Sequence, residues 1–214
     1  MRTNQHISPE LKLQFIPSMY FFVMGFRDSL KYLEDTSSNN ELQRMINEHC
    51  KEDSEHWRWY LQDLQWLQEH KVISDEDLKV NQNKVWSDEW FLVRNTTYDI
   101  IHSIKSNPSI LNRMAVLQVL ESTFDAFNSS VSPCIQQMDK WEDLYYFGKM
   151  HVDSEEGHSS HEWDYDDLEK VASLYHGFGE EECEAVEENV VRLFNRFNEM
   201  FEVWNKCNVS FIMN

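Results

Sequence analysis

The sequence predicts an all-helical bundle, and three features lead to this expectation. Gly and Pro number 5 and 4 among 214 residues, which is few for the many tight turns of a sheet protein. Aromatic residues form 14% of the chain and can fill a thick core between helices. Several long stretches repeat apolar residues at spacings of three and four, which places them on one helical face. The length predicts a single domain over residues 1–214.

Helix signals follow one another along the chain. Ser8 and Pro9 form a helix start, and an apolar stripe continues from there to Leu33. The polar run 35–40 separates this helix from the next, whereas residues 71–86 carry no clear pattern and are expected to be irregular. The later predicted helices are separated by Pro108 and by Ser132-Pro133. The predicted helices after the first cover residues 41–69, 87–104, 110–127, 141–158 and 180–205.

The excess of acidic residues in the chain argues against some classes of binding partner. Lys and Arg total 19 against 38 Asp and Glu, so the net charge is −19. Nucleic acids and anionic membranes attract clusters of Lys and Arg, so we expect neither as a partner. No apolar stretch reaches the roughly 18 residues of a membrane span, and the N-terminus has no apolar signal core. The cysteines form no C-x-x-C pair, so we expect reduced thiols and a cytoplasmic location.

Ionisable residues interrupt the apolar stripes of two predicted helices with the same spacing, His-x3-acid-x2-His. The two triplets are His49, Asp53, His56 and His151, Glu155, His158. On a helix, residues i, i+4 and i+7 fall within roughly 60° of each other, so each triplet is expected to lie on one buried edge. A single buried His is more often a hydrogen-bonded core residue than a ligand, but two matching triplets favour ligation.

Glu121 lies on the apolar stripe of the predicted 110–127 helix, where an unpaired carboxylate is costly to bury. Buried charges are tolerated when they pair or ligate a metal, and imidazole with carboxylate suits iron, manganese or zinc. A structural zinc site is disfavoured because no Cys faces inward beside these residues. We therefore expect a di-metal site with one metal per triplet and Glu121 between or near them.

The late triplet resembles a motif of the haem-oxygenase-like superfamily, and within it of the helical di-iron oxidases. The stretch 151–158 (HVDSEEGH), which follows 145–148 (YYFG), is similar to their His-x3-Asp-x2-His helix, with Glu155 in place of the usual Asp. The stretch 119–123 (VLEST) resembles the one that carries their central Glu on the preceding core helix.

The first triplet departs from the family pattern. The first core helix of these proteins gives a Glu and a His seven residues apart, and here His49 stands where that Glu is expected, with His56 seven residues later. Asp53 is the residue that could supply the missing carboxylate. The opening stretch 13–26 (LQFIPSMYFFVMGF) also looks like the first helix of such proteins.

The resemblance implies a single haem-oxygenase-like domain that holds two irons, with manganese or zinc as alternatives. It implies that the protein activates O2 and oxidises a small molecule. Haem itself is not expected, because the predicted first helix has no His to serve as an axial ligand. In addition, no glycine-rich kink follows Glu121. The sequence decides neither whether the protein forms a homodimer nor which small molecule is its substrate.

Two other functions stay open. The stretch 132–134 (SPC) resembles the nucleophile region of TenA-like proteins, metal-free hydrolases of the same superfamily that also contains the PqqC-like proteins. Cys134 would then be the nucleophile, although the sequence names no base to activate it. The third function is that of a non-catalytic helical interaction protein that keeps a decayed site.

Overall fold

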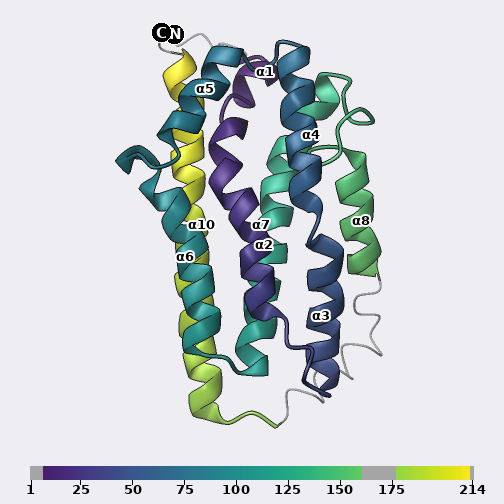
Figure 1. Cartoon of the computed structure of the whole chain (residues 1–214), viewed down its shortest axis with the longest axis vertical. Coiled ribbons are helices and arrows are strands. Elements are labelled where there is room, and N and C mark those ends of the chain that lie inside the picture. Colours follow the sequence, from purple (N-terminus) through teal and green to yellow (C-terminus); the bar gives the residue numbers. More distant parts are fainter. Residues whose placement is uncertain (1–6, 161–176, 213–214) are drawn as a thin grey trace, which may run out of the picture.

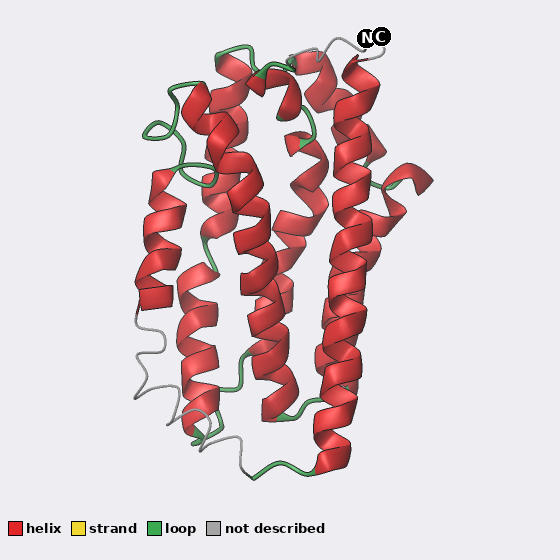
Figure 2. Ribbon diagram, turned by 180° about the vertical axis from the view of Figure 1, so that it is seen from behind, coloured by secondary structure: helices red, strands yellow, loops and turns green. Residues whose placement is uncertain are grey.

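The computed structural model describes residues 7–160 and 177–212, and these residues form helices and no strand. The predicted all-helical class is therefore confirmed for the described part of the chain. Figures 1 and 2 show the longer helices running side by side along the long axis of the molecule. Within the described ranges, no helix combines the length and the apolar content of a membrane span.

Short polar caps start several of the helices. The Asn40 side chain accepts a hydrogen bond from the backbone N–H of Leu42 at 2.9 Å, and Ser74 accepts one from Asp77 at 3.0 Å. The elements are α1 (Pro9–Lys12), η1 (Ile16–Met19), α2 (Tyr20–Leu33), α3 (Glu41–Asp53), α4 (His56–Glu69), α5 (Asp75–Lys84), η2 (Asp88–Trp90), α6 (Phe91–Ser106), α7 (Ile110–Gln137), α8 (Lys149–Ser160) and α10 (Glu180–Ile212).

One hydrophobic core runs through the bundle, where α6 and α10 pack beside α2 and α7. Large side chains such as Tyr60, Trp90 and Phe147 are fully buried in the protein. Each buried side chain of this size stabilises the fold by about 1.5–3 kcal/mol relative to an exposed one. Gly25 lies where α2 approaches α6. A Cβ atom at this position would come within 2.8 Å of the Thr97 methyl carbon, so the absence of a side chain permits the close approach.

The prediction of one helix over residues 41–69 is wrong at its centre, where residues 54–55 separate α3 from α4. The guanidinium of Arg27 donates to the Ser54 carbonyl at 2.9 Å and pairs with Glu55 at 2.6 Å. The Ser54 hydroxyl also donates to the Lys51 carbonyl at 2.8 Å. These bonds give the local carbonyls partners other than the helical ladder, and His56 begins a new helix.

Other predicted boundaries also differ from the structure. The segment 71–86, expected to be irregular, contains α5, which begins at the Ser74 cap. The first predicted helix is divided into α1, η1 and α2, with turn residues 13–15 between α1 and η1. The helix predicted over 141–158 begins only at Lys149, because residues 141–148 form turns.

The helix predicted over 110–127 continues as α7 to Gln137, through the expected interruption at Pro133. A proline inside a helix removes one backbone hydrogen bond and costs about 3 kcal/mol. Val131, Cys134 and Ile135 are buried around it, and their burial offsets this cost.

Candidate metal centre

His49, Asp53 and Glu121 form a compact cluster between α3 and α7. The His49 Nε2 atom lies 3.0 Å from Asp53 Oδ2 and 2.9 Å from Glu121 Oε1. His49 and Asp53 are one turn apart on α3, whereas Glu121 reaches them from the neighbouring α7. One ligand atom from each residue lies within 4.8 Å of the others, a spacing that a single metal ion can span.

The charges of this cluster are strongly coupled. Burial lowers the pKa of His49, but its hydrogen bonds with the carboxylates of Asp53 and Glu121 more than offset this effect and raise the pKa to about 11. Without a metal, His49 is therefore an imidazolium between two carboxylates. The proton on His49 thus provides the positive charge that a bound metal cation would provide in its place.

Asp53 carries a carboxylate oxygen that the protein does not satisfy. The Asp53 side chain is buried, and its Oδ1 atom has no hydrogen-bond partner among the described residues. His56 Nδ1 lies 3.8 Å from this atom, too far for a hydrogen bond. A buried carboxylate oxygen without a partner is costly, and a bound cation would remove that cost. One imidazole and two carboxylates suit iron, manganese or zinc.

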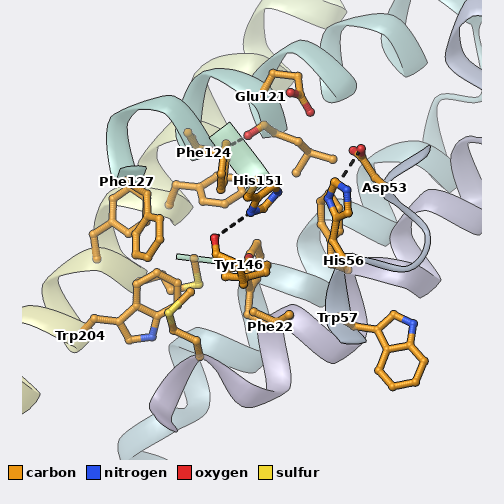
Figure 3. A pocket seen from close by; sticks show the side chains of 18 residues that line it. Phe22, Asp53, His56, Trp57, Glu121, Phe124, Phe127, Tyr146, His151 and Trp204 are labelled. Atoms are coloured by element: carbon orange, nitrogen blue, oxygen red, sulfur yellow. Dashed lines mark hydrogen bonds and ion pairs between the residues drawn. The ribbon is translucent and has the colours of Figure 1, made fainter. Parts of the chain in front are cut away.

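His56 and His151 form a second group beside this cluster, from α4 and α8. Their ring centroids lie 4.5 Å apart in an edge-on arrangement, and both side chains are buried (Figure 3). The Nδ1 atom of His151 lies 2.9 Å from the carbonyl oxygen of Tyr146. Because a carbonyl only accepts, the Nδ1 atom of His151 carries a proton.

The structure groups the predicted residues differently from one metal per triplet. His49 and Asp53 meet Glu121, whereas His56 packs against His151 on another helix and keeps its Nδ1 atom 3.8 Å from Asp53. Between them lies the break at residues 54–55, after which His56 begins α4. The remaining predicted ligands, Glu155 and His158, belong to α8, but their side chains lie outside the described part of the chain.

A cavity of about 60 Å³ adjoins these residues, large enough for a few water-sized molecules. Asp53, His56, Glu121 and His151 form its polar side, as Figure 3 shows. The rest of the wall is mainly aromatic and apolar, with rings such as Phe124 packed 4.3 Å from the ring of His151. The cavity therefore combines potential ligands with a mainly apolar lining.

Asp63 is a buried acid of α4 that the sequence analysis missed. Its Oδ1 atom accepts a hydrogen bond from the backbone N–H of Tyr145 at 2.8 Å, and Oδ2 accepts one from Phe147 at 3.0 Å. Burial raises the pKa of Asp63 to about 6, although the backbone donors act in the opposite direction. The signal was present in the sequence, since Asp63 lies between Tyr60 and Leu67 on the same helical stripe.

Cys134, the alternative nucleophile, lies away from this cluster. It is buried on α7, and its thiol lies 3.9 Å from the Ser130 carbonyl. It lines a second cavity of about 560 Å³, and the described residues around that cavity include no His, Asp or Glu. A cysteine nucleophile needs a base or a positive neighbour, and among the described residues that line this cavity the one cation is the exposed Lys12.

The fold and the site define a helical bundle with a buried cluster of histidines and carboxylates. The sequence matches no protein-family model and no curated protein sequence. The chemistry of the site is therefore the basis on which a function can be inferred.

Proposed function

We propose that this protein is a metal-dependent oxidase or oxygenase with a haem-oxygenase-like fold. In this proposal it holds two metal ions without haem, with iron as the expected metal, and uses O2 to oxidise a small molecule in the cytoplasm. The observation that supports it most is the meeting of His49, Asp53 and Glu121, in which the buried Oδ1 atom of Asp53 has no hydrogen-bond partner among the described residues. A binding or structural role gives no reason to bury an unsatisfied carboxylate oxygen beside a cavity.

The ligands divide into two sets. His49, Asp53 and Glu121 bind one ion, and His56 and His151 contribute to the second, with Glu155 and His158 as further ligands expected from α8. Iron held by imidazole and carboxylate ligands would supply electrons to O2. The Tyr146 carbonyl holds the Nδ1 proton of His151 and thereby fixes the orientation of that ring.

The aromatic residues around the two histidines have a separate task. Phe124, Tyr146 and Trp59 pack against the rings of His56 and His151 at centroid distances of 4.3–5.6 Å. These contacts fix the planes of the imidazole rings, and they keep water away from the site. Oxidation in a dry, apolar cavity favours an apolar portion of a substrate over a hydrated one.

Anaerobic titration with Fe(II), followed by metal analysis, tests the proposal. We expect about two ions per chain in the wild type, as in carboxylate-bridged sites of helical bundles. His49→Ala and Glu121→Gln are each expected to lose about one ion, and oxygen consumption on reoxidation should fall with them. His70→Ala is the matched control, because His70 is an exposed histidine at the end of α4, stacked on Trp66. Equal iron uptake by all four proteins would contradict the assignment.

The same experiment separates the remaining functions. A protein that binds no iron and consumes no oxygen, but folds stably, supports an interaction protein with a decayed site. A metal-free hydrolase would instead lose its activity in Cys134→Ala. The absence of a histidine or carboxylate among the described residues around Cys134 disfavours that function.

A further inference from the structure

The second cavity lies between the N-terminal segment, α7 and α10. Lys12, Leu13 and Phe15 line it from the N-terminal segment, Val131 from α7 and Trp204 from α10. Its volume of about 560 Å³ is much larger than the 60 Å³ beside the candidate ligands, so of these two cavities this one has more room for a ligand.

The two cavities share three aromatic residues of their lining. Phe127, Phe201 and Trp204 line both of them, and we call these three residues the aromatic wall. Their ring centroids lie 5.5–6.4 Å apart. Figure 3 shows Phe127 and Trp204 on the side of the metal cavity opposite Asp53. Rotation of these rings would join the cavities without moving a helix.

The charge of the second cavity is unusual for this protein. The chain has twice as many acids as bases, 38 against 19. Nevertheless, the described residues around this cavity include Lys12 and no carboxylate. Lys12 is exposed, at the end of α1, whereas Leu13 and Phe15 are buried. The described residues thus give this cavity an apolar interior and one positive charge, Lys12, at its edge.

We propose that the second cavity binds an amphipathic monoanion, with its anionic end at Lys12 and its apolar chain directed toward the aromatic wall. The chain end then faces the metal cavity, and the anionic group stays in water, where an ion pair needs no desolvation. As a statement about the substrate, the inference rests on the proposed oxidase function. The binding step itself requires no metal.

Calorimetric titration of the full chain with hexanoate, octanoate, decanoate and decanol tests the recognition. Each added methylene should raise the affinity about fourfold until the cavity is filled. Lys12→Ala should weaken decanoate binding about two- to fivefold and leave decanol binding unchanged. Lys79→Ala, which removes an exposed charge from α5, should change neither. An affinity independent of chain length, or equal losses for decanoate and decanol, would overturn the proposal.

The direction of the chain is tested with decanoate brominated at its last carbon, because bromine quenches tryptophan fluorescence only at short range. We expect quenching in the wild type that is largely lost in Trp204→Phe, while decanoate still binds. Quenching that persists in this variant would place the chain elsewhere among the 8 tryptophans. Failure to bind any of the carboxylates, as when a segment of the chain itself fills the cavity, would also refute the inference.

The two proposals fail in different ways. Binding of decanoate without iron uptake would keep the amphiphile site and remove the oxidase function. Iron uptake without decanoate binding would keep the oxidase function and remove the amphiphile site.

Discussion

Asp63 and Tyr145 lie 82 residues apart in the sequence, and the Asp63 carboxylate accepts a hydrogen bond from the backbone N–H of Tyr145 at 2.8 Å. The second carboxylate oxygen binds the N–H of Phe147, so one side chain of α4 holds the turn that precedes α8. The carbonyl between these two donors belongs to Tyr146, which accepts the Nδ1 proton of His151. A buried acid outside the ligand set therefore positions a candidate ligand.

Replacing Asp63 by Asn should test this relationship. The amide offers one acceptor and directs its NH2 group against the other backbone N–H, so a buried donor is left unsatisfied. We expect a loss of about 1–3 kcal/mol in the free energy of unfolding, measured by urea denaturation. In the folded variant, the nitrogen NMR shifts of His151 should show loss of the single Nδ1-protonated form. Asp143→Asn, an exposed change in the same turn region, should stay within about 0.5 kcal/mol of the wild type.

The metal-free protein should show a pH dependence that comes from His49. Its pKa is raised from the ordinary 6.5 to about 11, so the folded state binds the proton more tightly than the unfolded state. The resulting stabilisation is fully present below pH 6.5 and is lost as the pH rises through about 11. The difference in unfolding free energy between wild type and His49→Gln should therefore shrink steadily over that range. A difference that stays constant between pH 7 and 10 would contradict the charged cluster.

Metal binding should release a proton from the same cluster. A metal that takes Nε2 of His49 must displace the proton shared with Asp53 and Glu121. Affinity for Fe(II) should then rise about tenfold per pH unit where His49 is protonated. Titration calorimetry in two buffers of different ionisation enthalpy measures the released protons. His49→Ala should release about one proton fewer at neutral pH, whereas His70→Ala should match the wild type.

Native thiol labelling should distinguish the cysteines. Burial, with further contributions from Asp53 and Glu34, raises the pKa of Cys50 to about 12, so almost no thiolate forms at neutral pH. Cys183 is exposed at the start of α10. Iodoacetamide should therefore modify Cys183 rapidly and Cys50 only after unfolding, as peptide mass spectrometry would show. Rapid labelling of native Cys50 would mean that α3 opens locally.

Local spacing in the sequence was enough to predict the helical class and several of the clustered residues. Glu121 was identified because a carboxylate stood on an apolar stripe, and the structure places it 2.9 Å from His49. The same criterion would have identified Asp63 on the stripe of Tyr60 and Leu67. Such patterns are readable because a helix fixes which residues share a face, whatever lies elsewhere in the chain. The bound metals, the superfamily and the reaction stay predictions.

The grouping of the site was decided by tertiary contacts. Arg27 from α2 binds the Ser54 carbonyl and interrupts a stretch that local spacing read as one helix. Asp63 likewise replaces the expected helix before Lys149 by a turn. Both effects come from partners distant in the sequence, which satisfy backbone groups that a helix would otherwise use. The sequence by itself therefore determined which helical faces carry the candidate ligands, and only the packing of α2 and α4 decided where those helices end and which candidate ligands meet.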